Sequence, residues 1–189
     1  YEAKTLYGST ENLISDRQYE RAIATYERQL EVHPNHAFLV RRLMQLQVNR
    51  PEGMGEAVAL AKGRLARYPD DFDAQVTLGV AQCRQGQMAL AAETFGRVAD
   101  LAERRGDPVE AAQARCAVAS VLAESDPKAA VRALESAISL RRRLPGALRA
   151  LAELYADAGD WAAALRTRER LLASEENPGT KRQMLVELG

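Results

Sequence analysis

The feature that most constrains this chain is a pattern of small and apolar residues that returns about every 34 residues. Ala22 and Ala57 are 35 residues apart, and Ala57 and Ala91 are 34 apart. Ala130 and Ala164 are again 34 apart, whereas the interval from Ala91 to Ala130 is 39. A repeat of this length is typical of arrays in which one small structural unit stacks on the next. We therefore expect an array of similar units rather than one compact core.

Each unit is predicted to contain two helices and no strand. Apolar residues recur at helical spacing, and turn-forming residues separate the stripes. Asp107-Pro108 and Asp126-Pro127 each indicate an acidic N-cap followed by proline in the first helical turn, and Gly86 falls where a tight turn between helices needs a positive φ. We expect helices over residues 5–15, 19–33, 36–49, 54–68, 72–85, 88–105, 108–124, 128–142, 146–158, 161–175 and 180–188.

Two of the units carry a recognisable set of residues. In the third, Leu78-Gly79 precedes Gly86, and Ala91 and Phe95 follow four residues apart. The fifth repeats this set with Leu151, Ala152, Tyr155, Gly159, Trp161 and Ala164. The pattern resembles the tetratricopeptide repeat family, and the resemblance covers nearly the whole chain. It implies an all-α fold: a right-handed superhelical solenoid of about five helical hairpins plus a C-terminal helix.

The resemblance implies one domain, a single array over residues 1–189. We expect repeats at about 3–36, 37–71, 72–110, 111–144 and 145–178, with a capping or partial helix at 179–189. The first hairpin lacks the Leu-Gly pair, and the second helix of the third is extended through Leu101 to Arg105. Trp161 is interpreted as a packing residue at a hairpin turn, where aromatic side chains fill space between helices.

Composition and motifs exclude several functions. The 26 basic and 26 acidic residues cancel, so no global field attracts nucleic acid or anionic lipid. The apolar runs are too short for a membrane span. The sequence holds no phosphate-binding loop, nucleophile elbow or dinucleotide fingerprint. We expect no enzyme activity and no cofactor.

Arrays of this family bind peptides or protein helices in the concave groove lined by the first helix of each hairpin. The resemblance therefore implies a groove for one segment of a partner protein. The predicted groove residues are Phe38, Arg41, Gln45, Val76, Val80, Arg115, Arg149 and Glu153. Arginine forms paired hydrogen bonds with carboxylates, and the valines suit an apolar side chain of the partner. The expected partner is therefore acidic and apolar. The alternative is that the arginines pair with nearby Glu and that the valines pack between helices.

Histidine and cysteine patterns do not indicate a metal site. His33 and His36 flank a turn proline and lack a third ligand, so a role in the turn is expected. Cys83 and Cys116 are expected to be free thiols, because their positions along neighbouring helices differ too much for a disulfide. Free thiols favour a reducing compartment. We expect a cytoplasmic location, or a periplasmic one if the chain belongs to an export system.

The predicted function is a non-catalytic protein–protein interaction scaffold, whose oligomeric state the sequence leaves open. The alternative is a structural spacer segment of a longer repeat protein in a bacterial envelope, secretion or polysaccharide-export system. A third and weaker hypothesis is that the solenoid senses a peptide or a small signal. Solenoids carry their function in surface residues, so the sequence does not identify the partner.

Overall fold

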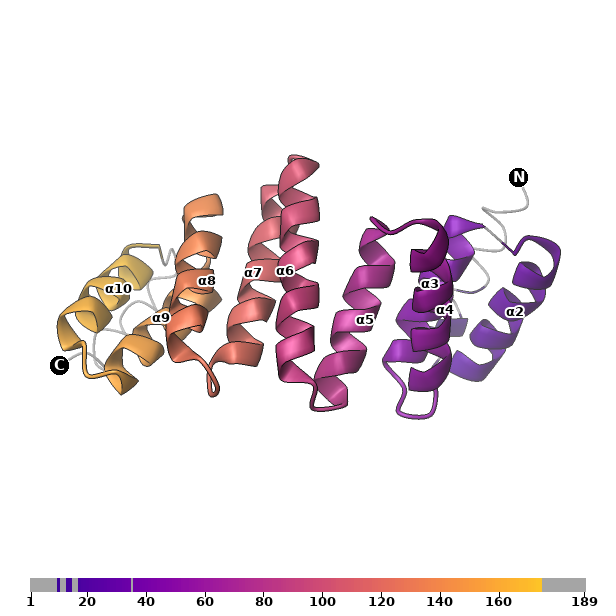
Figure 1. Ribbon diagram of the computed structural model, residues 1–189, viewed down its shortest axis with the longest axis horizontal. Coiled ribbons are helices and arrows are strands. Elements are labelled where there is room, and N and C mark those ends of the chain that lie inside the picture. The colour runs from indigo at the N-terminus through magenta and orange to yellow at the C-terminus, as the bar shows by residue number, and fades with distance from the viewer. Residues whose placement is uncertain (1–9, 11–12, 15–16, 35, 175–189) are drawn as a thin grey trace. The chain divides into compact units, whose positions relative to one another are not determined.

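The computed structural model describes residues 10, 13–14, 17–34 and 36–174. Within these residues the chain forms nine helices and no strand (Figure 1). The helices are α2 (Tyr19–Val32), α3 (Ala37–Val48), α4 (Met54–Arg67), α5 (Phe72–Arg84), α6 (Met88–Arg104), α7 (Pro108–Leu122), α8 (Pro127–Leu140), α9 (Pro145–Asp157) and α10 (Trp161–Ser174).

The all-α prediction is confirmed over this part of the chain, and each helix lies within two residues of its expected bounds. The helix expected over 5–15 falls largely outside the described residues, and the one expected over 180–188 falls wholly outside them.

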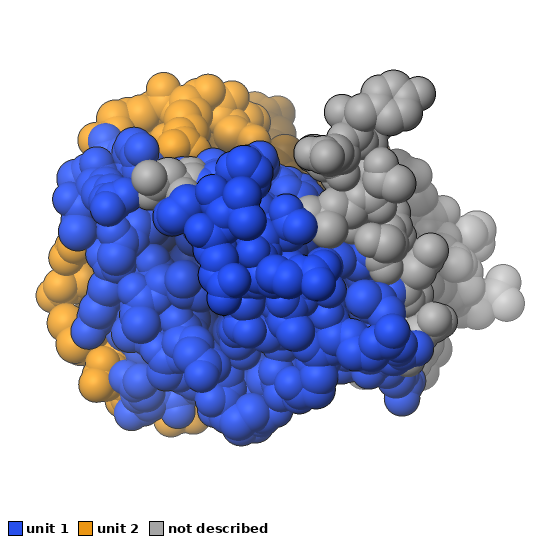
Figure 2. All heavy atoms as spheres, turned by 90° about the vertical axis from the view of Figure 1, so that its right-hand side faces the viewer, with its two compact units in different colours: residues 1–85 blue, residues 86–189 orange. Residues whose placement is uncertain are grey.

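The chain divides into two compact units, residues 1–85 and 86–189 (Figure 2). The boundary falls inside the predicted third repeat, between its two helices. In unit 1, α3 packs against α2, α4 and α5. In unit 2, consecutive helices from α6 to α10 pack against one another. The single array over 1–189 and its repeat boundaries stay predictions.

Local signals in the sequence set the helix ends as expected. Asp107 accepts hydrogen bonds from the backbone N–H groups of Val109 (3.0 Å) and Glu110 (2.9 Å). Asp126 accepts one from Ala129 N–H at 2.9 Å, and a proline follows each of these caps. The caps satisfy N–H groups that have no partner within the helix. Positive φ values occur at Gly86, Gly106 and Gly159, at the ends of α5, α6 and α9.

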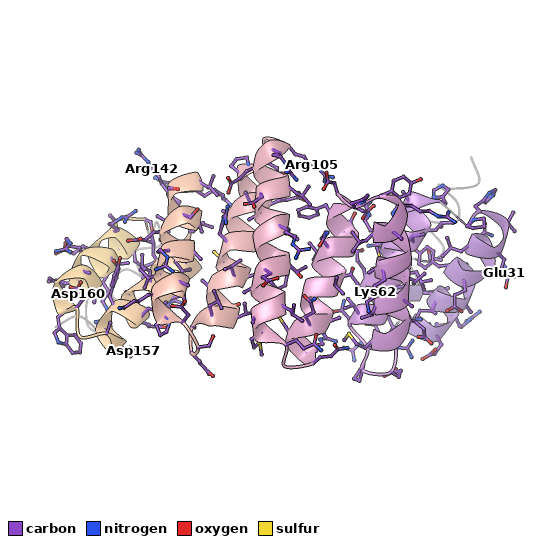
Figure 3. All side chains as sticks on the ribbon, viewed as in Figure 1. Glu31, Lys62, Arg105, Arg142, Asp157 and Asp160 are labelled. Atoms are coloured by element: carbon purple, nitrogen blue, oxygen red, sulfur yellow. The ribbon has the colours of Figure 1, made fainter. Side chains whose placement is uncertain are left out.

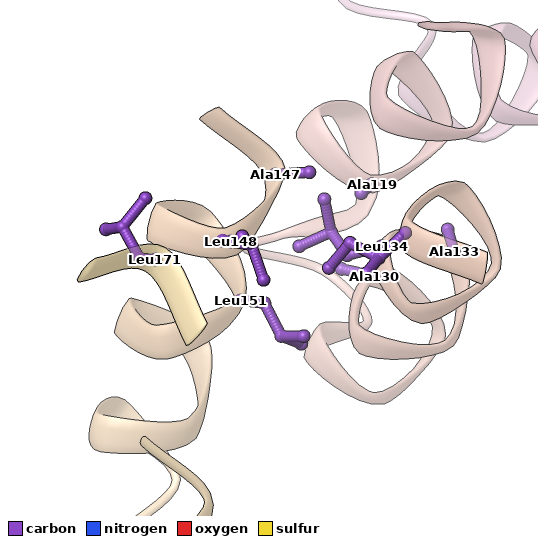
Figure 4. Packing of buried hydrophobic residues seen from close by; sticks show 9 residues of the cluster. Ala119, Ala130, Ala133, Leu134, Ala147, Leu148, Leu151 and Leu171 are labelled. Atoms are coloured by element: carbon purple, nitrogen blue, oxygen red, sulfur yellow. The ribbon is translucent and has the colours of Figure 1, made fainter. Parts of the chain in front are cut away.

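The core of unit 2 is a continuous apolar cluster of small and branched residues from four helices (Figure 4). Its buried leucines are Leu134 of α8, Leu148 and Leu151 of α9, and Leu171 of α10. Ala119 of α7 and Ala130 of α8 let the helix backbones approach closely. Burial of these side chains holds α7 and α9 in place against α8, because apolar burial is the main stabilising term in folding.

The core of unit 1 consists of two smaller clusters centred on α3. Leu39 and Leu43 pack with Ile23 and Tyr26 of α2. Val40 and Met44 of α3 pack with Ala61 of α4 and Ala74 of α5. Helix α3 therefore packs against α2 in one cluster and against α4 and α5 in the other.

Candidate functional site

A groove of about 450 Å³ lies in unit 2 between α7 and α9. These are the first helices of two consecutive predicted repeats, and Leu134 of α8 contributes to the lining. The lining residues are Cys116, Ala119, Ser120, Ala123, Glu124, Leu134, Gly146, Ala147, Ala150, Glu153, Leu154 and Asp157.

Helical periodicity brings these side chains together. On α7, Cys116, Ser120 and the following Glu124 are spaced four residues apart, and on α9, Glu153 and Asp157 have the same spacing. Residues four apart lie on one side of a helix. The many alanines and Gly146 leave the space between the two helices open, because small side chains fill little of it.

The charge of the groove is negative. Glu124, Glu153 and Asp157 contribute carboxylates, and no Lys or Arg is among the lining residues. Figure 3 labels Asp157 at the end of α9. Small apolar side chains and a carboxylate rim suit a segment that carries small apolar residues and a cation.

Cys116 is a half-buried free thiol in this groove, and Cys83 of α5 is a second free thiol in unit 1. Burial raises the pKa of both thiols. Both therefore stay protonated at neutral pH, and a protonated thiol is a poor nucleophile. Cys116 thus acts as a small apolar lining residue.

Tyr155 of α9 donates a hydrogen bond to Glu135 Oε1 of α8 at 2.7 Å. Burial, and then this hydrogen bond, raises the pKa of Tyr155 to about 12. The ordinary value is 10.0, so the folded state holds the proton more tightly than the unfolded state. The stabilisation is complete below the unfolded value and is lost as the pH rises through the folded one.

We expect Tyr155→Phe to flatten the decline of unfolding free energy between these two pH values. The measurement is urea unfolding of both proteins at a series of pH values across that range. An equal decline in the variant and the unchanged protein would show that Tyr155 does not carry this dependence.

Two predicted groove residues lie together in unit 1. Phe38 and Arg41 line a pocket of about 270 Å³, next to Asp73. Arg41 Nη1 lies 3.7 Å from Asp73 Oδ2, and the Arg41 guanidinium lies 5.9 Å from the Phe38 ring centroid. Arg41 is therefore already paired with a carboxylate of its own unit.

The other predicted residues of unit 1 lie apart from this pocket. Gln45 is exposed, and its side chain accepts a hydrogen bond from Arg42 Nη1 at 3.2 Å. Val76 and Val80 lie on α5, are half-buried, and are not among the residues that line the pocket.

Of the three predicted residues in unit 2, only Glu153 lines the α7–α9 groove. Arg115 is turned to α6, where its Nη2 lies 2.8 Å from Asp100 and 2.9 Å from Glu103. Arg149 is exposed, outside the lining, and has no ion-pair partner within the described residues. The alternative that arginines pair with nearby carboxylates thus describes Arg41 and Arg115.

Glu124, Ala150 and Asp157 were not among the predicted groove residues. The sequence held a signal for Asp157, because it lies four residues after the predicted Glu153 and therefore on the same side of the helix. Glu124 follows the end of α7, but it continues the four-residue spacing of Cys116 and Ser120, which was the signal for it.

The described residues contain no group of three His, Cys, Asp or Glu side chains arranged to hold a metal ion. The N–H of His36 donates to the carbonyl of His33 at 3.1 Å, so both lie in the turn before α3. None of the helices in the described ranges is both long and apolar enough to cross a bilayer.

Comparison with known families decides what kind of repeat this is. The tetratricopeptide repeat model matches residues 121–186. This range contains all lining residues of the α7–α9 groove except Cys116, Ala119 and Ser120. Residues 121–186 belong to the tetratricopeptide repeat family. The predicted resemblance is confirmed, and tetratricopeptide repeats are in general non-catalytic interaction modules. None of the curated proteins compared matches the sequence.

Solved tetratricopeptide structures extend the fold over most of the chain. MamA is 18% identical, with a TM-score of 0.75 over 88% of this chain and 94% of that one. PilF of Pseudomonas aeruginosa is 14% identical, with a TM-score of 0.73 over 96% and 80%. YrrB, a tetratricopeptide protein with an unusual peptide-binding site, is 20% identical, with a TM-score of 0.66 over 92% and 87%. At these identities the likeness shows the fold, a tetratricopeptide-type scaffold.

Proposed function

We propose that this tetratricopeptide scaffold holds a segment of a partner protein in the α7–α9 groove. The observation that carries the proposal is an open groove of about 450 Å³ with a lining of small residues and three carboxylates. The expected segment has small apolar side chains and at least one Lys or Arg. The location in the cytoplasm, and the periplasmic alternative, stay predictions.

The proposed charge preference differs from the expectation of an acidic partner. That expectation depended on free arginines, and Arg41 and Arg115 each pair with carboxylates of their own unit. The wider groove over all eight predicted residues, and an acidic partner for the exposed Arg149, stay untested predictions.

The expected affinity comes mainly from the apolar lining. An exposed ion pair contributes only about 0.2–1 kcal/mol, so the groove carboxylates are expected to set orientation and association rate more than affinity. Because salt screens exposed charges over about 8–10 Å, association should slow as the salt concentration rises.

The test uses a phage-displayed library of random short peptides selected on the full chain. We expect selected sequences to be enriched in Lys or Arg next to small apolar residues. Ala150→Leu, which fills the groove, should weaken binding of a selected peptide at least tenfold. Glu153→Lys should weaken it a few-fold and slow its association. The matched control is Glu93→Lys on the exposed side of α6, which should leave binding unchanged. Enrichment of acidic peptides, or equal binding by all variants, would refute the proposal.

A structural spacer is the second candidate function. Arg41 and Arg115 form ion pairs within the chain, which supports this function. A spacer segment needs no free charged groups for a partner. A spacer predicts no peptide whose binding depends on Glu153, so the same selection distinguishes the two functions.

A further inference from the structure

Unit 1 has a second hollow, which the proposed function does not use. This cleft of about 870 Å³ lies between α2 and α4, with α3 beneath. Its lining is Glu27, Leu30, Glu31, Pro34, Val40, Leu43, Gln47, Glu56, Ala59, Leu60, Gly63, Arg64, Arg67 and Tyr68. Helices α2 and α4 are second helices of predicted hairpins, whereas the proposed peptide groove lies between first helices.

The floor of this cleft is apolar and already part of the core. Val40 and Leu43 of α3 are buried, and Leu30 of α2 and Leu60 of α4 pack against them while staying half exposed. A groove with an apolar floor between two helices can bind the apolar side of an amphipathic helix.

The rim of the cleft carries both acidic and basic side chains. Glu27, Glu31 and Glu56 have no ion-pair or hydrogen-bond partner among the described residues, and Figure 3 labels Glu31 on α2. Of the two arginines in the lining, Arg64 is neutralised by Asp71, with Nε and Oδ2 2.7 Å apart, and Arg67 also has a partner within the chain. The unsatisfied charge of the rim is therefore negative.

Unit 2 exposes an apolar strip on α10. The expectation that Trp161 is a packing residue is wrong, because Trp161 is 71% exposed and Leu165, one turn later, is 53% exposed. The physical reason is periodicity. The buried side of α10 is formed by Ala163, Ala164, Thr167 and Leu171. At 100° per residue, Trp161 and Leu165 fall on a different side.

Helix α10 as a whole carries a net positive charge. Beside the strip, Arg168 lies three positions after Leu165 and Glu169 four positions after it, and both are exposed. The helix carries Arg166, Arg168 and Arg170 against one acid, Glu169. A partner for this strip must supply an apolar surface and carboxylates, which is what the α2–α4 cleft presents.

We propose that α10 of one copy of this chain docks in the α2–α4 cleft of a second copy. Trp161 and Leu165 would lie on the apolar floor, and Arg168 would face Glu27 and Glu31. Helices α2, α4 and α10 each have 14 residues, about 21 Å at 1.5 Å per residue, so the strip and the cleft match in length.

This contact joins different surfaces of the two copies, so it is head-to-tail. Such a contact leaves one free cleft and one free α10 on every assembly, and it propagates unless the geometry closes a ring. It is independent of the proposed peptide binding, because none of its residues lines the α7–α9 groove.

The test is analytical ultracentrifugation of the full chain from about 1 to 200 μM, where mass action reveals weak association. The unchanged protein should show a mass that rises with concentration and falls with added salt. Trp161→Glu and Glu27→Arg/Glu31→Arg should each raise the dissociation constant at least tenfold and leave a monomer. The control Leu90→Glu, which changes an exposed leucine on α6, should assemble normally.

Mixing the two monomeric variants gives the decisive result. The first retains its cleft and the second retains its α10 strip, so an equimolar mixture should form one heterodimer and nothing larger. Far-UV circular dichroism confirms that each variant is folded. A monomeric unchanged protein, variants that assemble normally, or a mixture that stays monomeric would each overturn the proposal.

Discussion

Replacing Leu148 by alanine is expected to destabilise unit 2 by about 2–5 kcal/mol, the range for removing a buried leucine side chain. Leu148 is 1% exposed and lies in the apolar cluster that joins α7, α8, α9 and α10. The loss combines the transfer free energy of the removed atoms with the cost of the cavity left between alanine-rich helices, which have few long side chains to refill it.

The measurement is urea unfolding followed by far-UV circular dichroism, because every described helix of unit 2 contributes to that signal. The matched control is Leu90→Ala on α6. Leu90 is 49% exposed, so its loss should change stability by about 0.5 kcal/mol or less. Similar effects of the two substitutions would contradict the assigned core.

Replacing Asp71 by alanine is expected to cost unit 1 about 2–4 kcal/mol, because this side chain has two roles. Its Oδ1 caps α5 by accepting the N–H of Ala74 at 3.0 Å, and its Oδ2 lies 2.7 Å from Arg64 Nε. Both side chains of the ion pair are largely buried, at 14% and 15% exposed. Alanine removes the cap and leaves the Arg64 guanidinium without its carboxylate in a partly desolvated position.

The comparison variant Asp71→Asn separates these two roles. Asparagine caps helices about as well as aspartate but carries no charge, so it should cost roughly 1 kcal/mol less than alanine. Both variants are measured by urea unfolding with far-UV circular dichroism. Equal losses for Asn and Ala would show that the cap contributes nothing.

Helix positions were predictable from the sequence because local chemistry sets them. An aspartate before proline satisfies free N–H groups at Asp107 and Asp126, and glycine takes the positive φ at Gly86. These effects depend on neighbouring residues alone, so no tertiary information was needed.

The orientation of individual side chains was less predictable, and α7 shows why. This helix is rich in alanine, so apolar residues occur on every side and periodicity does not define one buried face. Arg115 was expected in the groove, yet it is turned to Asp100 and Glu103 of α6. That outcome depends on acids more than ten residues away in sequence.

The most direct test of the central claim, that the α7–α9 groove is the binding site, is the alkylation rate of the two cysteines. Cys116 lines the groove, and Cys83 lies in unit 1 and serves as an internal control. Mass spectrometry follows N-ethylmaleimide labelling at fixed pH with and without a peptide selected from the library. A bound peptide should slow labelling of Cys116 at least tenfold and leave Cys83 unchanged. Unchanged labelling of Cys116 at saturating peptide would contradict the account.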